Sequence, residues 1–280
     1  MKKDTKKKLI LAGAAAAAAA IGLPLFAVAP GHATKRQKAP LYGLNYAHRG
    51  LHSQDKTIPE NSLAAFAAAA EAGYGVELDV QLSKDGRVVV FHDDTLNRVC
   101  GVDHRVDELT FDELRELRLC GTDEQIPLFT EVLAVISGRG PIICELKTGR
   151  HNRELCKKTY DIIQNYKGDI CIESFDPTIV AWFRFHAKDL VRGQLAAPAD
   201  EYPYSKALNF AISSCMLNFL SRPQFIAYKI GKRPLLVHIS EKMGAMVVGW
   251  TSHDPASEKK RDAVIFEFYR PRLKYREMKK

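Results

Sequence analysis

Short apolar, β-branched runs alternate with longer stretches of helical character through most of the chain. Strands that alternate with helices are typical of a parallel sheet with helical crossovers. Eight such runs within one chain of this length match a TIM (β/α)8 barrel, which usually takes about 250 residues. The eight predicted strands are Asn45–His48, Val76–Gln81, Ile142–Lys147, Ile170–Phe175, Leu190–Leu195, Phe225–Lys229, Met246–Thr251 and Ala263–Phe268.

One additional run, Arg87–Phe91, follows the second strand after only five residues. Parallel neighbours need a crossover of a dozen or more residues, so two runs this close must form an antiparallel hairpin. Asp85-Gly86 is a favoured two-residue hairpin turn. Continued along the ladder, this turn pairs Asp79 with His92, and we expect this carboxylate and imidazole to be neighbours.

The stretch from residue 93 to about residue 126 separates the hairpin from the next barrel helix. We expect a small insertion after strand two that lies over the barrel mouth. Thr110 and Glu113 have the spacing of a capping box and predict a helix over Thr110–Arg118. Before the second strand, the pattern predicts a helix from Asn61 to Ala72, with Asn61 as its N-cap.

Acidic residues gather where the predicted strands end, which is where a (β/α) barrel carries its catalytic groups. In Glu77-x-Asp79 and Glu145-x-Lys147 the period of two turns both members of each pair toward the barrel interior. Three carboxylates in one pocket repel one another, so they favour a divalent cation. An all-oxygen ligand set selects Mg²⁺ or Ca²⁺ over zinc.

Imidazoles and cations accompany these carboxylates. His48 and His92 titrate near neutral pH and can serve as general acid and general base. Arg49 and Lys147 suit phosphate oxygens. Together with a carboxylate-bound metal, this set indicates phosphodiester cleavage. Glu173 could reach the pocket from its strand, and a core salt bridge is the alternative. The other histidines are expected to be surface or packing residues: His52, His104, His151, His186, His238 and His253.

The positive charge of the chain is concentrated in its two tails. The net charge is +8, and residues 1–38 contribute +7 and residues 270–280 contribute +5, which leaves the body at −4. Nucleic-acid binding requires a basic face on the folded domain, so we exclude it. The composition, 46% hydrophobic and 26% charged, is ordinary for a globular protein and excludes a disordered chain or a multi-span membrane protein.

The N-terminus carries five lysines followed by Leu9–Ala29, 21 residues without a charge. This length favours an uncleaved single-pass membrane anchor with the lysines in the cytoplasm. A cleaved signal peptide with a site at Ala27-Val28-Ala29 is the alternative, and both place the catalytic domain outside the cytoplasm or secrete it. We therefore divide the chain into a basic N-terminus (1–8), an anchor or signal segment (9–30), a linker (31–40) and a barrel (41–280, insertion about 93–126). In an oxidising compartment Cys100 and Cys120 could form a disulfide, and buried free thiols are the alternative.

A specific series of motifs runs along residues 45–251. It comprises Ala47-His48-Arg49-Gly50, Pro59-Glu60-Asn61-Ser62, Glu77-Leu78-Asp79-Val80, Asp85-Gly86, Phe91-His92-Asp93, Ile126-Pro127, Cys144-Glu145-Leu146-Lys147, Ser174-Phe175 and Trp250-Thr251. In this order the chain resembles the glycerophosphodiester phosphodiesterase family. The resemblance implies a TIM barrel with a family-specific insertion after the second strand. The implied site comprises a metal held by Glu77, Asp79 and Glu145, His48 and His92 as the acid/base pair, and Arg49, Lys147, Glu60 and Trp250 as substrate-binding or phosphate-binding residues.

The resemblance implies hydrolysis of small glycerophosphodiesters to glycerol 3-phosphate and an alcohol. Two segments depart from the family pattern, Ser252-His253-Asp254 and Asp262–Phe268, and both fall where the alcohol would bind, so the alcohol is left open. One alternative is a phospholipase-like lyase on the same barrel that forms a cyclic phosphate. The other is a non-catalytic surface module that binds lipid headgroups or teichoic acids. Such a module is expected to have lost a pocket residue, and none is lost among His48, Arg49, Glu77, Asp79, His92, Glu145 and Lys147.

Overall fold

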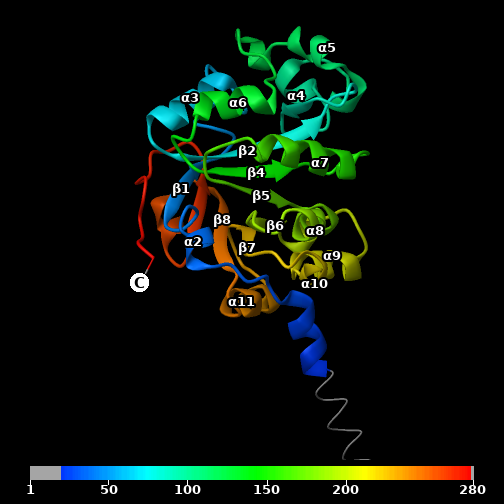
Figure 1. The fold of residues 1–280 in the computed structure, drawn as a ribbon, viewed down its shortest axis with the longest axis vertical. Coiled ribbons are helices and arrows are strands. Elements are labelled where there is room, and N and C mark those ends of the chain that lie inside the picture. Colours follow the sequence, from blue (N-terminus) through cyan, green and yellow to red (C-terminus); the bar gives the residue numbers. More distant parts are fainter. Residues whose placement is uncertain (1–19, 279–280) are drawn as a thin grey trace, which may run out of the picture.

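The protein, a computed structural model in which residues 20–278 are described, forms a closed barrel of eight parallel strands (Figure 1). The strands follow one another around the barrel in the order β1-β9-β8-β7-β6-β5-β4-β2, and β1 pairs with β2 to close it. The TIM-barrel prediction is confirmed. The strands are β1 (Leu44–Ala47), β2 (Gly75–Leu82), β3 (Val88–Val90), β4 (Ile142–Leu146), β5 (Ile170–Ser174), β6 (Arg192–Ala196), β7 (Phe225–Lys229), β8 (Met246–Ser252) and β9 (Ala263–Phe266).

Helices cover the outside of the barrel, and strand alternation decides which side chains they meet. Leu78 and Ile172 point outward and pack with Phe129 and Phe183 in one buried cluster, while Ile143 belongs to a second cluster inside the barrel. The α-helices are α2 (Lys35–Lys38), α3 (Leu63–Glu71), α4 (Asn97–Cys100), α5 (Phe111–Arg115), α6 (Phe129–Ile136), α7 (Asn152–Ile163), α8 (Pro177–His186), α9 (Lys206–Ser213), α10 (Asn218–Ser221) and α11 (Leu235–Lys242). Short 3-10 helices are η1 (Val106–Glu108), η2 (Leu119–Gly121), η3 (Ala199–Glu201) and η4 (Pro255–Glu258).

The β2–β3 hairpin is antiparallel, as predicted, but its predicted register is wrong by one residue. Val80 lies opposite Val90, so Asp79 pairs through its backbone with Phe91 rather than with His92. The turn contains three residues instead of two, and its last residue, Gly86, has φ +73°. Three-residue hairpin loops take a glycine in this left-handed conformation.

The insertion between β3 and α6 has a small apolar core of its own. Thr110 caps α5, and both hydrogen bonds of the predicted capping box are present, although the helix ends at Arg115 rather than Arg118. Cys100 and Cys120 are free thiols that pack against this core, which is the second of the two alternatives that the sequence left open. Burial raises the pKa of Cys100 to about 12, as expected of a packed thiol.

Residues 20–28 are helical and extend away from the barrel (Figure 1). Most of the predicted anchor, residues 9–19, lies outside the described residues. Among the helices within residues 20–278, none combines the length and apolar character that crossing a membrane requires. The end of this helix is packed on the barrel: Val28 is buried, and Arg222 donates hydrogen bonds to the carbonyls of Phe26 (2.9 Å) and Ala29 (2.8 Å).

Candidate active site

Three carboxylates meet inside the barrel near the carboxyl ends of β2 and β4. Glu77 and Asp79 project from β2, and Asp79 lies in register with Glu145 on β4. One ligand oxygen of each lies within 4.8 Å of the others, and the residues are only 2%, 1% and 7% exposed. The predicted convergence of these three residues is therefore confirmed.

This carboxylate set suits a hard divalent cation, because all of its donors are oxygens. Asp79 Oδ1 is buried and has no hydrogen-bond partner among the described residues. Burial raises the pKa of Glu77 well above its usual range, and the charges of Asp79 and Glu145 raise it further. Burial likewise raises the pKa of Glu145. A cation among these groups would favour their ionised forms, so the residues present fit a metal site.

Two cationic side chains surround the carboxylates. Lys147 Nζ lies 2.9 Å from Glu145 Oε1 and 3.4 Å from Asp79 Oδ1. The backbone N–H of Arg49 donates to Glu77 Oε2 at 3.1 Å, and its Nε lies 3.6 Å from Asp79 Oδ2. Burial opposes ionisation of Asp79, but the positive charges around it outweigh burial and hold its pKa below the usual range.

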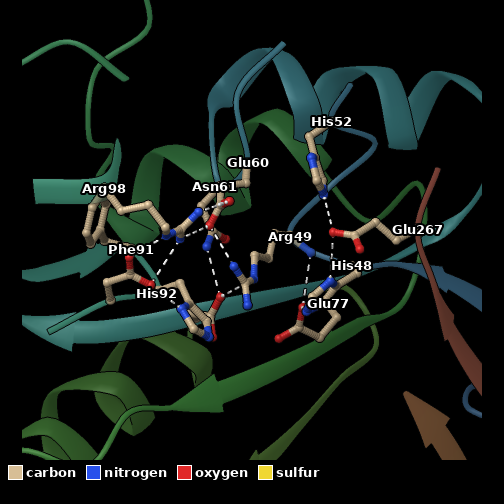
Figure 2. Close-up of polar contacts among 12 residues, drawn as sticks. His48, Arg49, His52, Glu60, Asn61, Glu77, Phe91, His92, Arg98 and Glu267 are labelled. Atoms are coloured by element: carbon tan, nitrogen blue, oxygen red, sulfur yellow. Dashed lines mark hydrogen bonds and ion pairs between the residues drawn. The ribbon is translucent and has the colours of Figure 1, made fainter. Parts of the chain in front are cut away.

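A chain of ion pairs links Arg49 to His92 (Figure 2). Glu60 accepts hydrogen bonds from Arg49 Nη1 (2.7 Å) and from both terminal nitrogens of Arg98 (2.6 and 2.7 Å). Arg98 Nε also donates to Asp93 at 2.6 Å, and Asp93 lies 2.6 Å from His92 Nδ1. Burial acts against ionisation of Glu60, yet the two guanidinium groups lower its pKa to about 2.

Arg98 is a site residue that the sequence analysis missed. It lies on α4 of the insertion, so the insertion contributes directly to the barrel mouth. No motif spacing connects it with Glu60 or Asp93, because the contact depends on how the insertion folds back.

The second histidine, His48, follows β1 and faces a carboxylate from the opposite end of the chain. Its Nδ1 lies 3.3 Å from Glu267 Oε1, and its Nε2 lies 4.0 Å from Glu77 Oε2 (Figure 2). The same Glu267 oxygen lies 2.9 Å from His52 Nε2. Burial lowers the pKa of His48, although Glu267 partly counteracts this. The three residues place His48 beside the acidic cluster in a fixed orientation.

His52 agrees with the packing alternative, since its side chain is only 8% exposed and its ring contacts Phe268, but its contact with Glu267 was not predicted. Glu267 was also missed as a site residue. It directly follows β9, the last strand of the barrel, so a systematic inspection of strand ends would have found it. The cluster of His48, His52 and Glu267 has ligand atoms within 4.8 Å of one another, which the hydrogen bonds explain.

The turn after β1 and the start of α3 hold a further contact. Ser62 rather than Asn61 caps α3, since its hydroxyl accepts from the backbone of Ala65 at 3.1 Å. Asn61, 2% exposed, instead donates from Nδ2 to Asp79 Oδ2 at 2.9 Å. Gly50 has φ +79°, and a Cβ there would lie 2.8 Å from that of Ala65, so the turn requires glycine.

Trp250 lies at the end of β8, in the aromatic part of the barrel mouth. Its Nε1 donates to the carbonyl of Ala227 at 3.0 Å, and its ring meets Phe175 edge-on with centroids 5.7 Å apart. These contacts hold the indole in place. Its role in substrate binding stays a prediction.

A protein-family model, described as the glycerophosphoryl diester phosphodiesterase family, matches residues 48–267. A glycerophosphodiester phosphodiesterase of Caldanaerobacter subterraneus subsp. tengcongensis is 39% identical over 113 residues, which are 37% of this chain and 44% of that protein. The chain thus aligns with less than half the length of this curated relative.

Solved structures give longer matches. The crystal structure of a glycerophosphodiester phosphodiesterase from Thermotoga maritima has 32% sequence identity and a TM-score of 0.62, and the match covers 80% of this chain and 93% of that one. An Oleispira antarctica phosphodiesterase, determined in complex with sn-glycerol-3-phosphate, has 23% identity and a TM-score of 0.67, with coverage of 80% and 93%. At that identity the second likeness concerns the fold alone.

Proposed function

Because the chain belongs to the glycerophosphoryl diester phosphodiesterase family, we propose that it hydrolyses glycerophosphodiesters to glycerol 3-phosphate and an alcohol, with one divalent cation, Mg²⁺ or Ca²⁺. One observation carries this proposal. The buried residues Glu77, Asp79 and Glu145 each have a carboxylate oxygen within 4.8 Å of the others, and Arg49 and Lys147 lie beside them. This combination of metal ligands and phosphate-binding cations suits phosphodiester cleavage.

The substrate phosphate is bound by the two cations. Arg49 presents a planar guanidinium that is held in place by Glu60, and Lys147 presents a point charge from the end of β4. The cation held by Glu77, Asp79 and Glu145 would supply Lewis-acid stabilisation of the phosphoryl oxygens. With a cation held there, Arg49 and Lys147 would no longer be the only positive charges beside the carboxylates and would be available to the substrate phosphate.

The two histidines move the protons. His48 is buried, which lowers its pKa and keeps its ring neutral, so we assign it the role of general base at Nε2. It deprotonates the nucleophile, either water or the 2-hydroxyl of the glycerol, and the latter gives a cyclic phosphate first. His92 is held by Asp93 through Nδ1, which fixes the orientation of its ring, and we assign it the protonation of the leaving alkoxide.

A product assay tests the proposed reaction. Glycerophosphocholine, glycerophosphoethanolamine and glycerophosphoglycerol are incubated with the metal-free protein, to which Mg²⁺ or Ca²⁺ is added back. Enzymatic detection of glycerol 3-phosphate is the expected result. A cyclic phosphate as the final product would identify a lyase instead, and no turnover of these substrates or of an aryl phosphodiester would indicate a binding module.

We expect Arg98→Ala to lower kcat at least about tenfold while changing KM less, because His92 loses the guanidinium that holds Asp93 in place. Arg98→Lys is expected to recover only part of the rate, since an ammonium cannot bridge Glu60 and Asp93 with a planar fork. Steady-state kinetics on glycerophosphocholine measure both effects.

The matched control is Arg118→Ala, which removes an exposed arginine of the same insertion. Within residues 20–278 its side chain bonds only to the backbone carbonyls of Arg115 and Leu117. If Arg118→Ala lowers kcat as much as Arg98→Ala does, the loss reflects the insertion as a whole and the positioning role of Arg98 is wrong.

We further propose that the barrel acts outside the cytoplasm, either anchored or secreted. The uncharged segment Leu9–Ala29 after five lysines supports export. The backbone of Gly31 bonds to Pro223, just before β7, so the N-terminal segment joins the barrel at the end opposite the candidate site. That arrangement suits a water-soluble substrate. Protease accessibility of the barrel in intact cells tests this location.

A further inference from the structure

A fourth carboxylate, that of Glu173, lies at the same height along the barrel axis as Asp79 and Glu145. Asp79, Glu145 and Glu173 occupy matching register positions on the neighbouring strands β2, β4 and β5. Ile143 and Cys171, two residues earlier on β4 and β5, belong to the cluster inside the barrel. Because alternate residues of a strand share a face, Glu145 and Glu173 also point into the barrel.

Glu173 is buried, and one of its carboxylate oxygens has no hydrogen-bond partner within residues 20–278. That oxygen is Oε2, and the residue is 1% exposed. On β6, the neighbouring strand on the side away from β4, Glu173 lies opposite Gly193. Gly193 has no side chain, and the ring of Phe225 fills the space beside it. No donor therefore reaches Glu173 from β6.

The salt bridge that the sequence left open for Glu173 is not found within residues 20–278. The ammonium of Lys147 acts on Glu173 through its charge, but it is paired with Glu145 and Asp79. Burying an ionised carboxylate without a partner is costly, so proteins pair such groups or coordinate metals with them. In its ionised form, Glu173 therefore needs a positive charge that the described side chains do not supply.

The number of charged groups in the pocket indicates how large a positive charge would neutralise it. Four buried carboxylates, including Glu77, face two cationic side chains, Arg49 and Lys147. If all of these groups are ionised, their net charge is −2. One divalent cation neutralises it, whereas the three carboxylates of the first cluster alone would leave an excess positive charge.

We propose that Glu173 is the fourth acidic group of the metal site and provides an oxygen to the cation, directly or through one water molecule. This inference rests on the proposed function of that site. Glu173 stands outside the group whose ligand atoms lie within 4.8 Å of one another, so it completes an outer position of the ligand set. Ca²⁺ takes six to eight oxygen ligands, whereas Mg²⁺ is usually bound through one or two carboxylates. Four carboxylates therefore select Ca²⁺ over Mg²⁺.

Isothermal titration calorimetry of the metal-free full-length protein with CaCl₂ and with MgCl₂ tests this proposal. Glu173→Gln keeps the shape of the side chain but removes its charge. We expect it to weaken Ca²⁺ binding at least about tenfold, the usual effect of losing an outer metal-site partner. Mg²⁺ binding should weaken less, so the preference for Ca²⁺ should fall.

Cys171→Ala is the matched control, because it alters the interior face of the same strand two residues earlier without changing a charge. Its Ca²⁺ affinity is expected to equal that of the unaltered protein. Equal Ca²⁺ affinity in Glu173→Gln and in the unaltered protein overturns the role of Glu173. Failure of the unaltered protein to bind either cation instead overturns the metal site of the proposed function.

Thermal melting in the presence of a chelator checks that Glu173→Gln is folded. Should it not melt cooperatively, Glu173→Asp carries the test, since it keeps the charge and shortens the side chain by one methylene. Its expected result is a weaker and less Ca²⁺-selective site, and unchanged affinity and selectivity contradict the proposal.

Discussion

Removing divalent cations with a chelator is expected to reduce hydrolysis of glycerophosphodiesters to background, and Ca²⁺ or Mg²⁺ is expected to restore it. Without a cation, the buried carboxylates of Glu77, Asp79 and Glu145 face the anionic phosphate of the substrate. Arg49 and Lys147 are both engaged by these carboxylates, so they cannot offset the repulsion alone. Release of glycerol 3-phosphate, measured before and after chelation, gives the result.

Two controls make this experiment specific. A chelator already saturated with Ca²⁺ should leave the rate unchanged, which excludes inhibition by the chelator itself. Melting curves of the chelated protein should remain cooperative, with a lower midpoint because the cation binds only the folded state. Full activity in the chelated, cation-free protein would remove the metal from the proposed mechanism.

Replacing His48 or His92 by alanine is expected to lower kcat at least about 100-fold, the usual scale for a general acid or base. Each ring lies at the acidic cluster and is oriented by its own carboxylate, Glu267 for His48 and Asp93 for His92. Steady-state kinetics on glycerophosphocholine measure the loss. His104→Ala removes an exposed histidine of the insertion and is expected to keep the full rate.

An aryl phosphodiester separates the two histidine roles. Its phenolate leaves without protonation, so His92→Ala is expected to lose much less rate on this substrate than on glycerophosphocholine. His48→Ala should remain impaired on both, because the nucleophile still has to be deprotonated. The reverse pattern would exchange the two assignments, and near-normal rates in both variants would refute acid/base catalysis by this pair.

Much of the fold and the core of the site were predictable, because both depend on local spacing. Alternate residues of a strand point to the same face, and this local rule is enough to place Glu77, Asp79 and Glu145 on the interior face of β2 and β4. The capping box at Thr110 is equally local, and it formed as predicted. Local interactions can also mislead: a three-residue turn ending at Gly86 replaced the expected two-residue turn and shifted the hairpin by one residue.

The sequence by itself thus determined the barrel, its strands and the residues that meet at their carboxyl ends, since each follows from a repeat of two or from a short motif. Only the tertiary structure decided which partners hold those residues. Closure of the barrel brings Glu267 to His48, and folding of the insertion brings Arg98 to Glu60. The pairing of β5 with β4 and β6 leaves Glu173 Oε2 without a hydrogen-bond partner in the described part of the chain. Contacts between residues far apart in the chain depend on how whole elements pack, and no local period encodes them.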